Sequence, residues 1–394
     1  MKVVQINSVC DSGSTGKICV AISKLLTENN IENYILYASG KSSYPLGIRY
    51  MSSIQVKIQA LISKILGNYG FESRMATRRL IKMIDSIKPD IVQLHNLHGH
   101  NVNLEILFSH LKRKNIKIFW TFHDCFAFTA YCMYFDMTGC NKWMGGCEKC
   151  PQRKKYSWFF DRSKWLYEKK KKALSGLDLT IITPSQWLSN LTKKSFLKEY
   201  PVKVIYNGID LSLFVPSKSD FRQKYSIPEY KAIILGVANK WEKRKGLDFF
   251  INLSYALDAD NYQIVLVGTN DNVDKLLPEN IISIHKTSNQ KELAQIYSAA
   301  DLFFNPTRED NFPTVNIEAL SCGTPVLTFK TGGSPEVIDE TCGLVLENDD
   351  IETIVGSIEN VIENKLFSRE NCLLRAKKFN SNDRFNEYIN LYTD

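Results

Sequence analysis

Two segments in the second half of the chain carry side chains that could bind a phosphorylated ligand. The sequence NKWEKRKG, residues 239–246, has three lysines and one arginine between a predicted strand and a predicted helix. Guanidinium and ammonium groups can offset the charge of a pyrophosphate without a metal ion. Arg244 and Lys245 are therefore candidate ligands, and the alternative is an exposed basic turn.

The second segment, TREDNFPTVNIEALSCGTPV, residues 307–326, carries two carboxylates eight residues apart, Asp310 and Glu318. Pro313 and Thr314 fit the first turn of a helix, so Asp310 is expected at its start and Glu318 about one turn further in. Carboxylates accept hydrogen bonds from vicinal hydroxyls, and helix N–H groups suit a phosphate. This pattern favours one contact to a sugar and one to a ribose, and the alternative is an ordinary helix with two solvated carboxylates.

Two candidate residues lie in the first half. Gly16 belongs to GSTGK, residues 13–17, which follows the first predicted strand and opens a helix. The segment matches neither GxGxxG nor the complete P-loop, which disfavours nicotinamide-cofactor and P-loop ATPase functions, and a turn without a ligand is the alternative. His123 follows a strand ending at Thr121, at the edge of a parallel sheet where ligands bind. A lone histidine is more often structural, but this position favours a functional role.

Histidines also follow the strand that ends at Leu94. His95, His98 and His100 are spaced like a metal-binding run, but no carboxylate lies close to them in the sequence. We expect them to line an interdomain cleft without binding a metal.

Ten cysteines in a chain with no export signal indicate reduced thiols. The segment 125–155 has no clear strand or helix period and holds five of them. Four are spaced C-x7-C-x6-C-x2-C, which suits a structural tetrahedral zinc site, although the first two spacings are longer than usual. Free or redox-active thiols are the alternative. The four candidate ligands are Cys132, Cys140, Cys147 and Cys150.

Short β-branched runs alternate with helix-length amphipathic segments along the whole chain, which predicts parallel sheets covered by helices. The 394 residues are too many for one core, so we expect two tandem doubly wound α/β domains. The predicted strands are 3–6, 34–37, 91–94, 116–121, 179–183 and 202–205, then 233–237, 263–267, 282–284, 302–305 and 326–329. Predicted helices in the second half are 246–257, 290–299, 314–321 and 351–363, and a last helix covers 379–394.

Charge divides the chain as well. Residues 1–200 contain 30 Lys+Arg and 14 Asp+Glu, which leaves 20 and 28 for residues 201–394. The segment 149–172 interleaves aromatic side chains with ten basic residues, a combination that suits an anionic membrane surface. Nucleic acid is a competing partner, and a solvated helix is a third reading. No run is long and apolar enough for a spanning helix, and the start is not a signal peptide.

In combination, the motifs resemble the retaining GT-B glycosyltransferases of family GT4, in the branch of capsule, O-antigen and colanic-acid synthesis. The resemblance covers nearly the whole chain: GSTGK, TFHDCFAFTAYCMYFDMTGC at 121–140, YNGID at 206–210, RKG at 244–246, and ALSCGTPV with TGGSPEVI at 319–338. It implies Rossmann-like domains over 1–204, with a Cys-rich insertion at 125–155, and over 205–378, facing a cleft. The helix 379–394 would cross back onto the first domain.

The resemblance also implies residue roles. The acceptor would bind the first domain and a nucleotide-sugar donor the second, with His123 facing the reacting sugar and Gly16 near the phosphate. Arg244 and Lys245 would bind the diphosphate and Glu318 the ribose hydroxyls. The N–H groups of three residues would hold sugar and phosphate: Asn311, Phe312 and Thr314.

This sequence departs from the family pattern at two places. Asp310 replaces the first glutamate of the motif and is a candidate catalytic residue. An arginine expected after the first strand of the second domain has no match unless Lys240 or Lys243 replaces it. The implied reaction needs no cofactor, because cationic side chains and helix N-termini stabilise the leaving nucleoside diphosphate.

We therefore expect a hexosyltransferase (EC 2.4 type) that retains the anomeric configuration. It would act at the inner face of the cell membrane, as a cytoplasmic peripheral protein, on an undecaprenyl-diphosphate-linked glycan of capsule or O-antigen synthesis. No nucleic-acid partner is expected. Two alternatives stay open at this point: a zinc-bearing nucleic-acid-binding protein, and a GT-B sugar-nucleotide epimerase that converts its donor without an acceptor.

Overall fold

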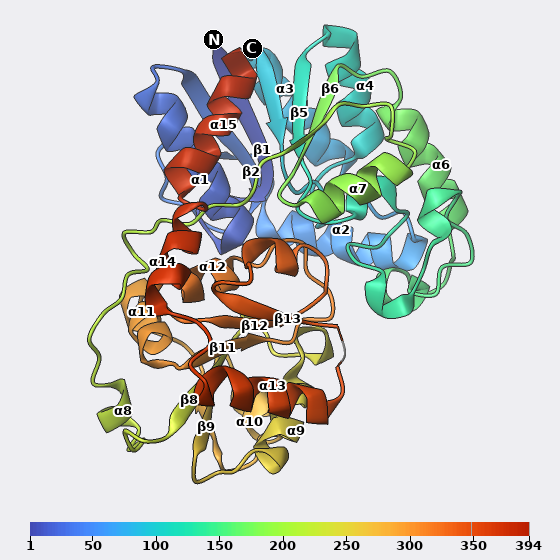
Figure 1. Cartoon of the computed structure of the whole chain (residues 1–394). Helices are drawn as coiled ribbons and strands as arrows, with labels where there is room; N and C mark the ends of the chain where they lie inside the picture. The colour runs from blue at the N-terminus through green and yellow to red at the C-terminus, as the bar shows by residue number, and fades with distance from the viewer. Residues whose placement is uncertain (348, 394) are drawn as a thin grey trace. The chain divides into compact units, whose positions relative to one another are not determined.

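A computed structural model describes residues 1–347 and 349–393, which form two compact units (Figure 1). Unit 1 comprises Met1–Tyr206 together with the chain end from Arg384, and unit 2 comprises Asn207–Asp383. The division after Tyr206 lies two residues from the boundary expected from the sequence. Asn348, in the predicted second domain, and Asp394, the last residue of the predicted C-terminal helix, lie outside the described residues.

Unit 1 is built on a seven-stranded parallel sheet in the order β3-β2-β1-β4-β5-β6-β7. Every residue of β4 is buried, as expected of a central strand covered by helices on both faces. The strands are β1 Lys2–Val9, β2 Glu32–Ser39, β3 Gly47–Arg49, β4 Ile91–Leu94, β5 Lys117–Thr121, β6 Leu179–Thr183 and β7 Val202–Val204. The sequence analysis missed only β3 among them, because three residues give too short a pattern to recognise.

The helices of unit 1 connect successive parallel strands. They are α1 Gly13–Glu28, α2 Ser53–Leu66, α3 Arg74–Ile87, α4 Leu104–Lys114, α5 Arg153–Tyr156, α6 Ser163–Leu174 and α7 Gln186–Lys194. The connection from β5 to α6 contains three 3₁₀ turns besides α5: η1 Phe126–Phe128, η2 Asp136–Thr138 and η3 Lys142–Met144. The segment without a clear period therefore has short structure of its own.

Unit 2 contains a six-stranded parallel sheet in the order β10-β9-β8-β11-β12-β13. Its strands are β8 Ala232–Val237, β9 Tyr262–Val267, β10 Ile281–Ile284, β11 Leu302–Asn305, β12 Val326–Phe329 and β13 Gly343–Leu346. Its helices are α8 Phe221–Lys224, η4 Lys243–Lys245, α9 Leu247–Ala256, α10 Asp271–Asp274, α11 Gln290–Ala299, α12 Thr314–Ser321, η5 Ser334–Val337, α13 Ile351–Glu363 and α14 Arg369–Lys377. The expected class of two doubly wound α/β domains is confirmed.

Strand order determines where a ligand can bind in each unit. The order reverses between β1 and β4 in unit 1 and between β8 and β11 in unit 2. Connections leave opposite faces of the sheet at such a point, which opens a crevice beyond the carboxyl ends of the two strands. The basic segment follows β8 and Asp310 follows β11, so both lie at the switch point of unit 2.

The last helix, α15 Ser381–Thr393, begins in unit 2 and continues into unit 1 (Figure 1, red). Its buried side chains pack into a core with residues of α1 and of four strands of unit 1, β1, β4, β5 and β6. Tyr388 and Tyr392 hydrogen-bond to Thr121 of β5 (3.1 Å) and Gln93 of β4 (2.8 Å). The C-terminal helix thus returns to the first domain. In the part of the chain that the structure describes, none of the helices could cross a bilayer.

Candidate active site

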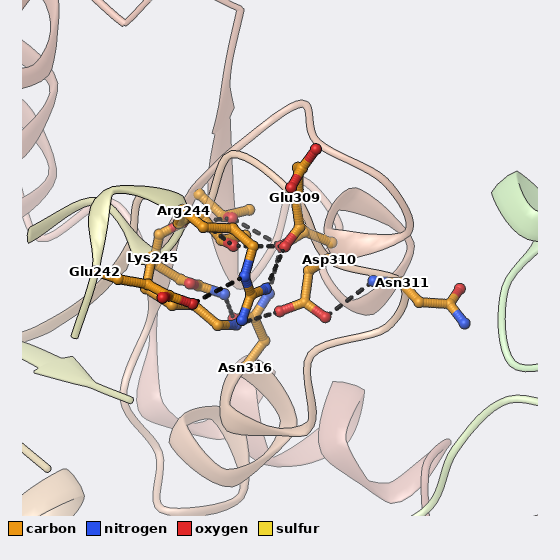
Figure 2. Close-up of polar contacts among 11 residues, drawn as sticks. Glu242, Arg244, Lys245, Glu309, Asp310, Asn311 and Asn316 are labelled. Carbon is orange, nitrogen blue, oxygen red and sulfur yellow. Dashed lines mark hydrogen bonds and ion pairs between the residues drawn. The ribbon is translucent and has the colours of Figure 1, made fainter. Parts of the chain in front are cut away.

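Arg244 and Lys245 converge on the loop that follows β11 (Figure 2). The Lys245 Nζ lies 2.5 Å from the Asp310 Oδ2. Arg244 donates to the backbone carbonyl of Glu309 at 2.8 Å, and its Nε lies 3.4 Å from Glu242 Oε1. Two cations from one loop are thus positioned by groups of the neighbouring loop.

The ion pair gives Asp310 a role that the sequence did not predict. Its Oδ2 holds Lys245, and its Oδ1 accepts from the Asn311 N–H at 2.9 Å. The structure thus shows Asp310 positioning Lys245, and a catalytic role of its carboxylate stays a prediction. The Asn311 N–H, which was expected to hold the sugar, bonds to Asp310 in this structure.

A second ion pair joins the same two loops from the outer side. The Arg308 guanidinium makes two hydrogen bonds to the Asp248 carboxylate, at 2.7 and 2.8 Å, and lies over the Phe249 ring at 4.1 Å. It also donates to the Lys243 carbonyl at 2.7 Å. A fork-to-fork pair stacked on a ring fixes orientation as well as distance. Sequence reasoning missed this clamp because its two halves lie sixty residues apart.

Two glycines allow the loops of unit 2 to approach closely. Gly246 has φ +77, and a Cβ there would lie 2.4 Å from the Pro306 carbonyl oxygen. Gly332 has φ +57, and a Cβ there would lie 1.7 Å from the Asp310 carbonyl oxygen. Any larger residue would push the backbone of residues 306–310 away, so both glycines are steric requirements of the site.

The start of α12 is fixed by a buried chain of amides and hydroxyls. Asn305, at the end of β11, donates to Asn316 at 2.7 Å, and Asn316 donates to Ser334 at 2.9 Å. Ser334 lies 2.8 Å from Thr328 of β12. This network links two strands, α12 and η5. The signal available in the sequence was Asn316, a polar residue between the apolar Val315 and Ile317.

The other predicted residues of unit 2 lie along α12 and just before it. Phe312 is buried, with its ring centroid 5.7 Å from that of Phe379, and Thr314 is half-buried as the first residue of the helix. Glu318 accepts from the Tyr297 hydroxyl at 3.1 Å. Tyr297 is fully buried, so this bond holds the Glu318 carboxylate at the inner side of α12.

In unit 1, His123 ends a chain of hydrogen bonds that begins in β1. Gln5 donates through Nε2 to the Cys19 carbonyl at 2.9 Å, which leaves its Oε1 to accept from His95 Nε2 at 3.1 Å. His95 Nδ1 must then accept, and its partner at 3.2 Å is His123 Nε2. Since His123 Nε2 donates, its Nδ1 carries the lone pair. The chain therefore selects one tautomer of His123.

Burial keeps both rings neutral. Loss of solvation lowers the pKa of His123 from 6.5 to about 4, although Asp124 acts in the opposite direction. The pKa of His95 is also lowered well below its usual value, again by burial and then by His123. A neutral imidazole can donate and accept at the same time, which an imidazolium cannot.

The fold supplies the carboxylates that seemed absent near the histidines in the sequence. His98 Nε2 lies 2.8 Å from Asp124 Oδ2, and His100 Nδ1 lies 2.9 Å from Glu72 Oε1. Burial raises the pKa of Asp124, but His98 and the Phe126 N–H lower it, and the net shift is downward. The His95 side chain is buried against Gln5 and His123 in unit 1, and the expected place of these histidines in an interdomain cleft stays a prediction.

Gly16 lies in the first turns of α1, directly after β1. A Cβ at this position would lie 3.1 Å from the Asp11 backbone nitrogen, so a side chain would press on the loop after β1. Asn7 steadies the same loop by donating to the Val9 carbonyl at 2.9 Å and to Thr15 at 3.3 Å. The turn is compact in its own right, and its fit to a phosphate stays a prediction.

The four predicted metal ligands, Cys132, Cys140, Cys147 and Cys150, are brought together. All four line one small cavity in the β5 to α6 connection of unit 1, and each is a free thiol.

Solved structures share this architecture at low sequence identity. Sucrose-phosphate synthase (tll1590) from Thermosynechococcus elongatus superimposes with a TM-score of 0.72 and 16% identity, covering 100% of this chain and 98% of that one. Anabaena Alr3699/HepE in complex with UDP gives a TM-score of 0.71 and 15% identity, with 100% of both chains covered. Two tandem Rossmann-like domains of this kind define the GT-B class of glycosyltransferases.

Sequence comparison identifies the family. Residues 17–213 match "Glycosyltransferase Family 4" and residues 217–379 match "Glycosyl transferases group 1". The chain belongs to glycosyltransferase family 4, and it is a glycosyltransferase. One relative is the "Putative colanic acid biosynthesis glycosyl transferase WcaC" of Escherichia coli (strain K12), 20% identical over 419 residues, with 100% of this chain and 99% of that protein covered.

Proposed function

We propose that this protein transfers a hexose from a nucleoside diphosphate sugar to a lipid-linked glycan, with retention at the anomeric carbon, during synthesis of a surface polysaccharide. The observation that carries the proposal is the pair Arg244 and Lys245, held beside the start of α12 at the switch point of unit 2. Two similar proteins support it: a sequence relative named for colanic acid biosynthesis, and a structural neighbour solved in complex with UDP.

Each part of the donor has a matching group in unit 2. The diphosphate would meet Arg244, Lys245, the N–H group of Thr314 at the start of α12 and that of Phe312 just before the helix. Glu318 would accept hydrogen bonds from the ribose hydroxyls, because carboxylate oxygens are acceptors and Tyr297 fixes the orientation of this one. The Asn311 N–H would turn from Asp310 to the sugar when donor binds.

A thermal-shift panel tests donor binding. UDP, GDP and ADP, with their hexose conjugates, are added to the wild type and to Glu318→Ala. Ligand that binds only the folded state raises the Tm. One diphosphate should stabilise the wild type and lose its effect in Glu318→Ala. Glu347→Ala, an exposed carboxylate paired with Lys330, is the matched control and should respond like the wild type. Failure of every nucleotide to shift the wild type contradicts the proposal.

The transfer itself needs no protein nucleophile. The C1–O bond to the phosphate breaks with its electron pair on the leaving diphosphate, the acceptor hydroxyl oxygen bonds to C1 on the same face, and its proton passes to the departing phosphate. Arg244 and Lys245 offset the charge that develops, in place of a divalent metal. His123 is neutral and held in one tautomer, so its Nδ1 would accept a hydrogen bond from a sugar hydroxyl.

Product stereochemistry tests retention. With an α-linked donor, NMR of the product should show an α-linkage, and a β-linkage would contradict the mechanism. Activity should persist without added Mg²⁺ or Mn²⁺. An epimerase would instead convert the donor in the absence of any acceptor, so an acceptor-free incubation separates the two functions.

Unit 1 presents an exposed apolar surface that suits a membrane-borne acceptor. Helix α2 exposes aliphatic side chains spaced along one face, and residues 158–165 expose aromatic ones. The two parts are joined, because the Trp158 N–H donates to the Lys64 carbonyl and Lys64 Nζ donates to the Lys155 carbonyl. The exposed apolar residues are Ile54, Ile58, Leu61, Ile65, Leu66, Trp158, Phe159, Phe160 and Trp165.

Basic side chains surround this surface, which favours anionic lipid over other apolar partners. Arg162 lies over the rings of Phe160 and Trp165, at 5.6 and 5.7 Å, and Lys169 lies over Trp165 at 4.8 Å. Aromatic rings and long basic side chains both favour the headgroup region of a bilayer, where the rings are buried and the charges stay in water. We propose that this surface places the protein at the inner face of the cell membrane.

Vesicle co-sedimentation tests this surface. The protein should bind vesicles containing phosphatidylglycerol and not pure phosphatidylcholine vesicles, and binding should weaken with salt. Phe159→Ser should reduce binding several-fold, whereas Tyr255→Ser, an equally exposed aromatic residue in unit 2, should not. Equal loss in both variants, or binding to RNA in place of vesicles, would overturn the membrane assignment.

A further inference from the structure

The cysteine-rich connection of unit 1 has a feature that sugar transfer does not use. Cys132 follows η1, Cys140 follows η2, and Cys147 and Cys150 follow η3. Although they come from three separate turns, all four line a single cavity of about 20 Å³. That volume is close to what one water-sized sphere needs, so the cavity suits one ion.

The sulfur atoms interact with one another and with backbone donors. The Cys132 and Cys150 side chains are close enough to interact, and Cys140 and Cys147 act electrostatically on Cys132. The backbone N–H groups of Ala130 and Gln152 lie near the Cys147 and Cys150 side chains, respectively. Backbone N–H groups aimed at sulfur stabilise thiolates and orient them toward a metal.

The turn that carries the last two cysteines is held from outside. The Asp161 carboxylate accepts from the Cys150 N–H at 2.7 Å and from the Ser163 N–H at 2.9 Å. Lys149, between the two cysteines, has φ 44, a left-handed conformation that tightens the C-x2-C turn. Side chains at both ends of the turn are thereby directed to one side.

Positive charge lies next to the cavity. Lys142 Nζ donates to the carbonyls of Glu148 and Lys149 at 3.1 and 3.2 Å, inside the same turn. Lys170, fully buried behind it, donates to the carbonyls of Phe126 and Thr129 at 2.6 and 2.7 Å. A divalent ion with four thiolates has a net charge of −2, and Lys142, which lines the cavity, offsets part of it.

From this arrangement we propose that Cys132, Cys140, Cys147 and Cys150 bind one Zn²⁺ with structural rather than catalytic function. Four thiolates fill the tetrahedral shell and leave no position for substrate. Within the described residues, no three of these cysteine sulfurs all lie within 4.8 Å of one another. Binding of zinc would therefore have to bring the sulfur atoms closer together. The ion would join three turns that otherwise share few backbone hydrogen bonds.

The proposed zinc site is linked by hydrogen bonds to the turn that follows His123. The Cys125 N–H donates to the Met133 carbonyl. This bond holds the residue after Cys132 against the residue after Asp124. The Phe126 N–H bonds to Asp124, and the Phe126 carbonyl to Lys170. Loss of metal would therefore loosen the turn that positions His123.

Metal analysis of the full-length protein, purified without chelator, tests the proposal. Elemental analysis should find about one zinc per chain, and replacement by Co²⁺ should give the d–d absorption of a tetrahedral tetrathiolate. Cys140→Ser and Cys147→Ser should each lose most of the zinc. Cys10→Ser, which removes a buried thiol elsewhere in unit 1, should retain it.

Three results would overturn the proposal. The first is wild-type protein without zinc whose cysteines all react with a thiol reagent. The second is a Cys132–Cys150 disulfide, found by intact mass under non-reducing conditions. The third is full zinc content in Cys140→Ser. Because the readout is bound metal, none of these outcomes depends on the sugar-transfer function.

Discussion

At the scale of single residues, Lys245 and Asp310 form the central ion pair of the proposed donor site. Lys245→Ala should weaken nucleoside diphosphate binding by about 10- to 100-fold, because a charge-assisted hydrogen bond of about 1.5–3 kcal/mol is lost. Titration calorimetry with the stabilising diphosphate measures this. Asp310→Asn keeps the shape and frees the ammonium, so binding should fall less than in Lys245→Ala. A larger loss in Asp310→Asn would assign the carboxylate a direct contact to the ligand.

His123 makes stability depend on pH in a defined direction. Its pKa is lowered from 6.5 to about 4, so the unfolded chain binds more protons than the folded one between these values. The contribution of His123 to the free energy of unfolding is fully present above pH 6.5 and is lost as the pH falls from 6.5 to about 4. Urea unfolding from pH 7.5 to 4.5 should show a falling midpoint, and His123→Gln should flatten the curve.

His285 provides the control for this experiment. It is exposed, and hydrogen bonding to Asp274 raises its pKa, so its contribution has the opposite sign and is lost as the pH rises. His285→Gln should leave the acid-side decline in place. An unchanged pH profile in His123→Gln would show that other groups cause the decline.

At the scale of elements, replacing glycine by alanine should have opposite effects on stability at Gly332 and at Gly356. Gly332→Ala should destabilise the protein and weaken donor binding, because its Cβ would meet the Asp310 carbonyl oxygen and φ is +57. Gly356 lies inside α13 with nothing within 4 Å of a Cβ, so Gly356→Ala should stabilise by about 0.5–1 kcal/mol. Thermal unfolding distinguishes them, and a shift of the same sign in both contradicts the steric argument.

Helix α6 depends on one buried lysine to hold the turn η1. Lys170→Met should cost about 1–3 kcal/mol for each of the two carbonyls left without a donor, those of Phe126 and Thr129. Denaturant unfolding measures the loss. Lys164→Met, on the exposed side of the same helix, is the matched control and should change stability little.

The sequence predicted elements best where strands are fully buried and helices have clear caps. Strands 91–94, 302–305 and 326–329 and helices 290–299 and 351–363 agree with the structure to the residue. Gly343–Leu346 was missed because it is an edge strand of four residues with a weak apolar pattern. Such a strand is defined by its partner β12, and pairing between distant segments is not visible in local periodicity.

The candidate site was only partly predictable for the same reason. Residue types and their place after strands identified Arg244, Lys245, Asp310 and Glu318. Which of them contact one another depends on distances between loops, so the Lys245–Asp310 pair could not be predicted. The partner of Glu318, Tyr297, lies in a different helix and has no motif of its own.

At the scale of the whole molecule, the C-terminal helix completes the core of unit 1. Deleting residues 384–394 should expose the apolar side chains of α1 and the sheet that α15 covers, and should lower the stability of unit 1 by several kcal/mol. Limited proteolysis should then cleave unit 1 first, while unit 2 stays protected. Tyr392→Phe, which removes only the hydroxyl bonded to Gln93, should have a small effect by comparison. Equal protease resistance in the deletion variant and the wild type would contradict this role.

The path of the chain through the two units also sets the order in which they can form during translation. Unit 1 uses both ends of the chain, whereas unit 2 is one uninterrupted stretch, Asn207–Asp383. Translation runs from the N-terminus, so residues 1–206 leave the ribosome before α15 is made, and unit 1 then lacks the helix that covers Ile18 and Ile22. The nascent first unit therefore keeps part of its apolar core open until α15 has been made and has left the ribosome. A chaperone that binds exposed apolar chain should associate with the nascent protein for that time, and a C-terminal extension, which lets α15 leave the tunnel during translation, should shorten the association.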